Sequence, residues 1–232
     1  MERNELVLLR LSNQYLLRAG ERMEVLRAMN GFQAQFLSNA LHAMRLRSTA
    51  YDTAHAADSL VKSWTLRGTM HIFAEADLPL FLHTGCRYRS RDWTVPSFWN
   101  QRPNWALTPK RQAYFSDLII DALAQGPMTR EALKARCRAA GMTQAEEGSI
   151  FHPWGGGIRE LCERGFLCGT VSEEKAFRLC PAFTPMEEQD ALLEQTRRYF
   201  TNYGPASVRD AAYYFGTSQA EIEKRLARLP VE

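Results

Sequence analysis

The sequence predicts a mainly α-helical fold with short β wings, of the α+β class. Apolar residues recur at helical spacing along several stretches, and glycine or proline ends most of them. Two groups of helices are each followed by two strand-like runs, which is the element order of a winged helix. Gly126-Pro127 and Gly204-Pro205 also stand just before Thr129 and Ser207, residues that can cap a new helix. This repeat predicts tandem winged-helix domains.

The first predicted domain spans residues 1–107. Helices are expected at residues 6–17, at residues 21–29 and from Phe32 onward, where Phe36, Ala40 and Met44 form an apolar stripe. Two strands are expected at residues 63–66 and 70–73, on either side of Arg67-Gly68-Thr69. Residues 84–109 hold three tryptophans and three prolines, so we expect an irregular connector there. Its aromatic side chains can pack on domain surfaces or stack on bases, and packing is favoured.

The second and third predicted domains share one plan. In residues 108–185 the pattern predicts helices near 109–124, from Met128 and near 158–164. Strands are expected to follow near 166–171 and 176–180. Residues 186–232 read as a helix near 187–201, a capped helix after Ser207 and a helix near 218–229. The sequence stops at Glu232 before any wing strands. We therefore expect the third domain to be incomplete, with its wing absent.

Charge is unevenly distributed along the chain. Residues 1–111 carry 15 Lys+Arg and 9 Asp+Glu, whereas residues 112–232 carry 14 and 17. A basic N-terminal half is typical of a surface that binds a polyanion such as DNA, although chance scatter is the alternative. Arginine outnumbers lysine 24 to 5, which suits bidentate phosphate contacts but also fits a bias in genomic base composition.

Several classes of site and location are disfavoured. The five cysteines are irregularly spaced and contain no C-x-x-C pair, so we expect reduced, mostly buried thiols and no metal site. Gly155-Gly156-Gly157 lacks the Lys-Ser/Thr of a P-loop, which argues against ATP binding. No cofactor is expected. No apolar run reaches the ~18 residues that span a bilayer, and we expect a cytoplasmic, nucleoid-associated protein without a membrane partner.

The segment that carries most information is Gln33-Ala34-Gln35, which follows Gly31-Phe32. Two glutamines alone are more often ordinary polar residues at the start of a helix. Their setting, however, resembles the AlkZ-like (YcaQ-type) winged-helix DNA glycosylases, in which a Gln, an apolar residue and then Gln or Asp occupy the active site. Three further segments support the resemblance, namely 64–71 (WTLRGTMH), 183–185 (FTP) and 197–207 (RRYFTNYGPAS).

The resemblance covers essentially the whole chain, and it implies that the family's further C-terminal β-rich region is absent after residues 186–232. It also implies a function. Gln33 and Gln35 are then the catalytic residues of a monofunctional glycosylase. It hydrolyses the N-glycosidic bond of cationic N3- or N7-alkylated purines in base-excision repair and can unhook interstrand crosslinks. The implied partner is double-stranded DNA with alkylated bases or crosslinks, and we expect a monomer. A non-catalytic winged-helix transcriptional regulator is the alternative, and a protein-interaction scaffold is a third.

Geometry places a condition on the two amides. In a regular helix, side chains two positions apart point about 200° from each other. If the third helix starts near Phe32, Gln33 and Gln35 share one ligand only when both project from its open first turn. If they do not, the interpretation as an active-site motif fails.

Four further residues are candidates for contact with DNA. Arg67 and His71 flank the turn of the first predicted wing, and Arg45 and Arg47 follow the glutamine-bearing helix. Each has a plainer alternative, since a wing histidine is more often structural and a basic helix end is often just solvated. His152 beside Pro153-Trp154 shows no metal partners in the sequence.

Overall fold

A computed structural model describes residues 2–82, 91–172 and 174–229. The chain packs as two compact units. The first, here the split unit, contains residues 1–83 and 184–232, and the second, here the middle unit, contains residues 84–183. The two ends of the sequence therefore belong to one packed body, which holds every candidate site residue named above.

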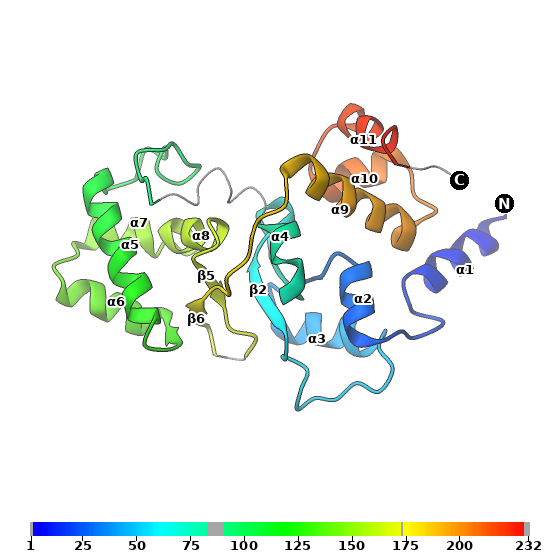
Figure 1. Cartoon of the computed structure of the whole chain (residues 1–232), viewed down its shortest axis with the longest axis horizontal. Coiled ribbons are helices and arrows are strands. Elements are labelled where there is room, and N and C mark those ends of the chain that lie inside the picture. The colour runs from blue at the N-terminus through cyan, green and yellow to red at the C-terminus, as the bar shows by residue number, and fades with distance from the viewer. Residues whose placement is uncertain (1, 83–90, 173, 230–232) are drawn as a thin grey trace. The chain divides into compact units, whose positions relative to one another are not determined.

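The N-terminal part of the split unit surrounds a small antiparallel sheet (Figure 1). Its elements are α1 (Arg3–Asn13), α2 (Arg22–Ala28), β1 (Phe32–Gln33), α3 (Leu37–Arg45), β2 (Leu60–Trp64), β3 (Met70–Ala74) and α4 (Leu78–Phe81). Strand β3 is central and pairs with β1 on one side and β2 on the other. The buried residues Val61, Ile72 and Phe73 pack from the sheet into the core.

Three C-terminal helices complete the split unit. They are α9 (Glu188–Tyr203), α10 (Val208–Phe215) and α11 (Gln219–Leu226). Helix α9 packs against α1, α2 and α4 as well as against α10 and α11. The buried residues Tyr199, Ala211, Ala212 and Ile222 hold the three helices together.

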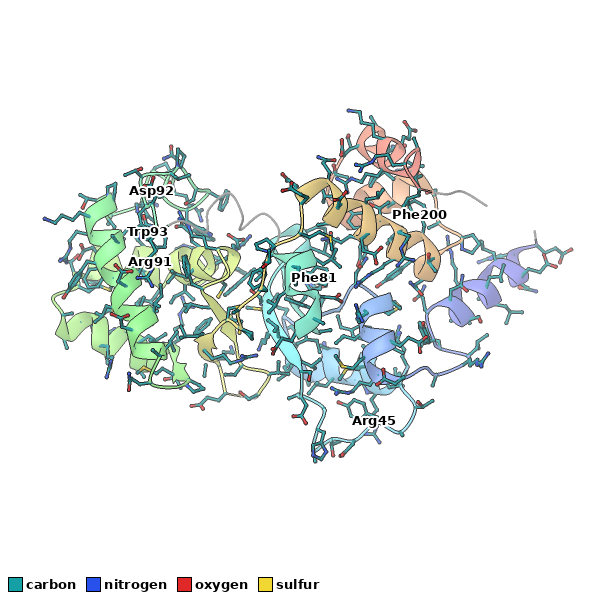
Figure 2. All side chains as sticks on the ribbon, viewed as in Figure 1. Arg45, Phe81, Arg91, Asp92, Trp93 and Phe200 are labelled. Carbon is teal, nitrogen blue, oxygen red and sulfur yellow. The ribbon has the colours of Figure 1, made fainter. Side chains whose placement is uncertain are left out.

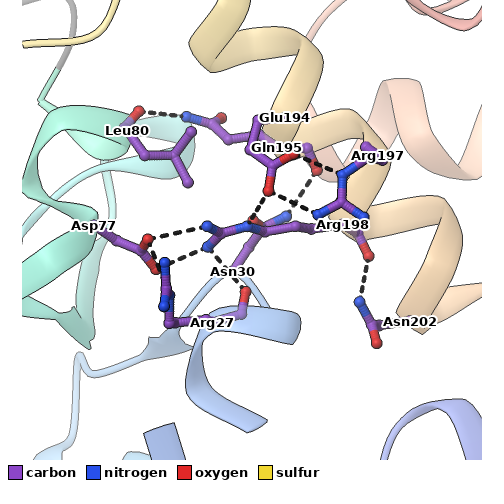
Figure 3. A network of polar contacts seen from close by, with 9 residues as sticks. All are labelled: Arg27, Asn30, Asp77, Leu80, Glu194, Gln195, Arg197, Arg198 and Asn202. Carbon is purple, nitrogen blue, oxygen red and sulfur yellow. Dashed lines mark hydrogen bonds and ion pairs between the residues drawn. The ribbon is translucent and has the colours of Figure 1, made fainter. Parts of the chain in front are cut away.

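A buried polar network joins α9 to the N-terminal elements (Figure 3). Arg198 donates two hydrogen bonds to the carboxylate of Asp77, with N–O distances of 2.7 and 3.0 Å, and one to the backbone oxygen of Arg27. The Asn30 amide donates to the Gln195 carbonyl, and the Gln195 amide donates to the Leu80 carbonyl. Buried polar groups are costly unless paired, so these contacts fix α9 in one position.

The middle unit has the same mixture of helices and short strands. Its elements are α5 (Pro109–Leu123), β4 (Met128–Thr129), α6 (Arg130–Ala139), α7 (Gln144–Ile150), α8 (Gly156–Glu163), β5 (Leu167–Gly169) and β6 (Ala176–Leu179). Strand β6 pairs antiparallel with both β4 and β5. Thr108 and Thr129 cap α5 and α6 through their side-chain oxygens, as the sequence predicts for Thr129.

Residues 91–107 of the predicted connector contain neither helix nor strand, as expected. Its tryptophans serve packing, because Trp93 and Trp99 are both 3% exposed. The guanidinium of Arg164 lies 4.2 Å from the Trp93 ring centroid and donates to the backbone oxygen of Asp92. Figure 2 labels Asp92 and Trp93. The earlier part of this connector, including Cys86, lies outside the described residues.

The predicted fold class, mainly helical with short antiparallel wings, is confirmed. Several boundaries are wrong: the helix expected at residues 6–17 ends at Asn13, and the strand expected at residues 63–66 ends at Trp64. The helix expected from Phe32 begins at Leu37, because Phe32–Gln33 pair with β3 as a strand. Helix α7 was not predicted. The division into three domains at residues 107 and 185 stays a prediction. No described helix has the length and apolar character needed to cross a membrane.

Candidate active site

Gln33 is the last residue of β1, and Gln35 lies in the bend that leads from the sheet to α3. Phe32 and Ala34 are buried while Gln33 and Gln35 are exposed, and this alternation continues past the end of β1. The backbone N–H of Ala34 donates to the Met70 carbonyl at 2.7 Å, which keeps the segment against β3. Both amides are therefore exposed, two residues apart, where the chain leaves the sheet.

The helical condition placed on the two glutamines is not met, because Gln33 ends a strand and Gln35 lies in the bend before α3. The separation of about 200° that a regular helix imposes therefore does not apply to them. Neither amide forms a hydrogen bond with any described residue, so both have their donors and acceptors available. The apolar residue between them, Ala34, is 1% exposed and anchors the segment to the core.

The turn before the glutamines depends on Gly31. Its φ is +75°, and a Cβ at this position would lie 2.5 Å from the backbone oxygen of Ile72. Only glycine permits this close approach of the chain to β3 without strain. Gly31 thus sets the path by which Phe32 and Gln33 enter the sheet.

A polar row crosses the sheet from the exposed Gln33. The Cα partner of Gln33 on β3 is His71, and the partner of His71 on β2 is Ser63. Directly opposite residues of antiparallel strands project to the same face. The row therefore runs from an exposed amide through a nearly buried imidazole to a buried hydroxyl that has no hydrogen-bond partner among the described residues.

His71 is held in a defined protonation state. The pKa of His71 is lowered to about 4, mainly because the ring is buried. Its hydrogen bond to Thr69 raises the pKa in part, and the charge of Arg67 lowers it further. The ring is therefore neutral at physiological pH. Its Nδ1 lies 3.1 Å from the Thr69 carbonyl, which can only accept, so Nδ1 carries the proton. The Nε2 atom is left as the acceptor.

Arg67 occupies the β2–β3 turn (Leu66–Gly68) with a left-handed φ of +55°. Its guanidinium lies 6.0 Å from the ring centroids of both Tyr213 and Tyr214 on α10. Because Arg67 also lowers the pKa of His71, its charge acts on the polar row. The structure thus places the wing turn against helix α10.

The remaining basic candidates differ from one another. Arg45 is exposed at the last residue of α3. Arg47 is half-buried, lies 5.6 Å from the Phe32 ring centroid and donates to the backbone oxygen of Ala43. His71 is 6% exposed and neutral, so it is a neighbour of Gln33 rather than an exposed cation. The contact of Arg45, Arg47, Arg67 and His71 with DNA stays a prediction.

Sequence reasoning missed Tyr203, Tyr213 and Tyr214 as neighbours of the site. The run Tyr213-Tyr214-Phe215 was a visible signal, since an exposed aromatic residue on a polar helix face is unusual, but its distance in sequence from Arg67 concealed the contact. No group of three or more possible metal ligands occurs among the described residues. Burial raises the pKa of Cys137 to about 12, which leaves its thiol protonated.

Comparison with known proteins gives three matches. A family model described as DNA glycosylase AlkZ-like matches residues 26–232. A curated protein of Streptomyces sahachiroi named interstrand DNA cross-link repair glycosylase is 29% identical over 202 residues, which cover 80% of this chain and 52% of that protein. The solved structure of Streptomyces sahachiroi DNA glycosylase AlkZ superposes with a TM-score of 0.73 at 22% identity, covering 99% of this chain and 66% of the other. The chain thus spans about half the length of the curated relative.

Proposed function

The chain belongs to the DNA glycosylase AlkZ-like family, and from this premise we propose that it excises cationic N3- or N7-alkylated purines from double-stranded DNA. The reaction is hydrolysis of the N-glycosidic bond in base-excision repair. The observation that carries the proposal is the exposure of both Gln33 and Gln35, with Gln33 beside the neutral imidazole of His71. The name of the curated relative supports extending the substrates to interstrand crosslinks.

The charge of the substrate explains how two amides suffice. An N3- or N7-alkylated purine is already a cation, so it leaves as a neutral base without being protonated. Positive charge then develops on the sugar, whose transition state resembles an oxocarbenium ion. Side-chain carbonyl oxygens facing that charge stabilise it, and they can orient the water that attacks the sugar. A strong general acid is not required.

Gln33 and Gln35 supply those oxygens from a fixed segment. Each side chain has a carbonyl and an NH₂ group, and neither group is hydrogen-bonded to any residue that the structure describes. One amide oxygen faces the anomeric carbon, and the other accepts a hydrogen bond from the attacking water. Groups preorganised in this way are each worth roughly 2.7–4 kcal/mol of transition-state stabilisation in other enzymes.

His71 orients the first glutamine. With Nδ1–H donated to Thr69, the Nε2 lone pair on the same face of the sheet is the acceptor for the NH₂ group of Gln33 once DNA occupies the site. An amide held by its nitrogen presents its oxygen outward. A charged imidazole would instead repel the cationic substrate, so the lowered pKa of His71 suits the proposed reaction.

The test uses duplex DNA that contains one N7-methylguanine, followed by alkaline cleavage of the abasic product. Gln33→Ala and Gln35→Ala should each slow base release by about 100- to 1,000-fold, as expected for a lost electrostatic contact. Gln125→Ala, which changes an exposed glutamine of the middle unit, is the matched control and should retain full activity.

Two results would contradict the proposal. Tight DNA binding with no base release at any protein concentration would favour the winged-helix regulator instead. Efficient release of uracil, an uncharged base, would show that the two amides are not limited to cationic leaving groups. A protein with this activity works on chromosomal DNA, so we propose association with the nucleoid.

A further inference from the structure

A groove of about 560 Å³ lies within the split unit, beside the β2–β3 turn. Basic and aromatic side chains line it, among them Arg10, Arg67, Arg209, Tyr203, Tyr213 and Tyr214. They come from α1, the β2–β3 turn, α9 and α10, so that the groove is made by both ends of the sequence. Its volume falls within the range of about 300–1,000 Å³ that is usual for ligand pockets.

Two of the three arginines of the groove are available to a ligand, whereas Arg10 donates to the backbone oxygen of Pro205 at 2.8 Å. Neither Arg67 nor Arg209 forms a hydrogen bond or ion pair with the residues that the structure describes. The nearby carboxylate of Asp210 is engaged instead in capping α10, where it accepts from the backbone nitrogen and hydroxyl of Ser207 at 3.0 and 2.8 Å. These hydrogen bonds lower the pKa of Asp210, and the charges of Arg10 and Arg209 lower it further. Two unpaired guanidiniums in one groove are suited to phosphate oxygens.

The aromatic side of the groove is rigid. The Tyr214 ring packs against Tyr199 and Tyr203, with centroid distances of 4.6 and 5.3 Å. The Tyr203 hydroxyl donates to the Met29 carbonyl at 3.2 Å. Tyr213, the residue before Tyr214 on α10, is 79% exposed although it is large and aromatic. An exposed ring on a fixed support is the arrangement on which a nucleobase stacks.

We propose that this groove binds an unstacked nucleotide of the DNA, with the base on the ring of Tyr213 and the flanking phosphates at Arg67 and Arg209. The inference rests on the proposed function, since opening the duplex around a damaged base produces such a nucleotide. Arg67 lines the groove and stands in the turn that leads into β3, the strand that carries His71 beside Gln33. A purely anionic peptide would use the arginines but would gain nothing from the exposed ring.

The experiment follows 2-aminopurine fluorescence in a duplex that carries the fluorescent base unpaired next to one N7-methylguanine. Stacking on Tyr213 should quench the fluorescence when the chain binds. Tyr213→Ala should abolish this quenching and weaken binding by about 5- to 150-fold, the range expected for one stacked base. Tyr213→Phe should restore both. Arg209→Gln should reduce the slope of log affinity against log salt by about one.

Tyr114→Ala is the matched control, because Tyr114 is an exposed tyrosine of the middle unit. It should leave both the quenching and the affinity unchanged. Equal quenching and equal affinity for Tyr213→Ala and the unsubstituted chain would overturn the inference, as would an equal loss in Tyr213→Phe and Tyr213→Ala. Thermal unfolding of each variant establishes that α10 is intact.

The two proposals fail in different ways. Gln33→Ala should lose base release while it keeps the quenching that depends on Tyr213. If the unsubstituted chain quenches the probe through Tyr213 but releases no base, the inference holds and the proposed function fails. If base release is normal and Tyr213→Ala changes neither quenching nor affinity, the inference alone fails.

Discussion

Gln33 and His71 are Cα partners on the antiparallel strands β1 and β3. An exposed amide thus stands beside an imidazole that is only 6% exposed. The hydrogen bond from Nδ1–H to the Thr69 carbonyl fixes the tautomer of that imidazole, and its burial keeps it neutral. This pairing ties the behaviour of the candidate site to the protonation of one buried side chain.

His71 should make the fold sensitive to mild acid. Its pKa is about 4 in the folded chain and near 6.5 when unfolded, so the unfolded state binds the proton first as the pH falls. Stability is therefore complete above about pH 6.5 and is lost progressively toward pH 4. The loss attributable to His71 at pH 5, relative to pH 8, is about 2 kcal/mol.

Urea unfolding at pH 8 and pH 5 measures this loss in the unsubstituted chain and in His71→Gln. The variant removes the titrating group, and the other groups contribute equally to both proteins. The difference between the two pH values should be smaller in the variant by about 2 kcal/mol. Identical differences would show that His71 is not buried as the neutral form.

Gly31→Ala should cost more stability than a glycine substitution elsewhere with the same backbone. Gly141→Ala is the matched control, since Gly141 has a φ of +82° with no atom within 4 Å of a new Cβ. Both variants incur the left-handed strain of about 1–2 kcal/mol. Gly31→Ala additionally places its Cβ against the Ile72 carbonyl, which forces β1 away from β3. The free energy of unfolding in urea and the rate of base release should both fall further in Gly31→Ala than in Gly141→Ala. Equal losses in the two variants would contradict the close approach of Gly31 to Ile72.

The parts of the fold that depend on local signals could be predicted from the sequence. Helix α10 begins where Ser207 caps it, and α6 begins where Thr129 caps it, because a cap acts on amides two or three residues away. The turn at Arg67-Gly68-Thr69 likewise separates two runs that become β2 and β3. These boundaries agree with the structure to within a few residues.

The parts of the fold that depend on contacts between residues distant in sequence could not be predicted. Phe32 and Gln33 form a strand only because β3 offers a partner, and their apolar neighbours at steps of four suggested a helix. This difference changes the geometry of the candidate site, since Gln33 belongs to a strand and Gln35 precedes α3, where the sequence suggested a first helical turn. The contact between Arg67 and Tyr213 is equally invisible in sequence, because it arises from the packing of α10 beside the β2–β3 turn.

Arg198→Met should destabilise the split unit strongly. Arg198 forms the buried ion pair with Asp77, and without it a carboxylate that is 3% exposed loses its closest partner. Removing one member of a buried pair typically costs about 3–5 kcal/mol. The more distant Arg27, 3.5 Å from Asp77 and half exposed, should compensate only in part.

Arg197→Met provides the comparison for Arg198→Met. Arg197 precedes it on α9 and pairs with Glu194, but its side chain is about half exposed. Surface pairs contribute about 0–1 kcal/mol. Urea unfolding should therefore separate the two variants by at least about 2 kcal/mol. Equal unfolding midpoints would mean that the Arg198–Asp77 pair does not anchor α9.

Arg45 and Arg47 should respond in opposite ways to the same substitution, although they are two residues apart. Arg45 is exposed at the end of α3 (Figure 2), whereas Arg47 lies over Phe32, donates to the Ala43 carbonyl and has a pKa lowered by burial. If Arg45 contacts a phosphate, Arg45→Gln removes one released counterion and reduces the slope of log affinity against log salt by about one. The melting temperature of Arg45→Gln should be unchanged.

Arg47→Gln should instead lower the melting temperature, because it removes the side chain that packs on Phe32 beside Gln33. DNA titrations at several salt concentrations, paired with thermal unfolding, distinguish the two roles, and an unchanged salt slope in Arg45→Gln would remove Arg45 from the DNA-binding surface.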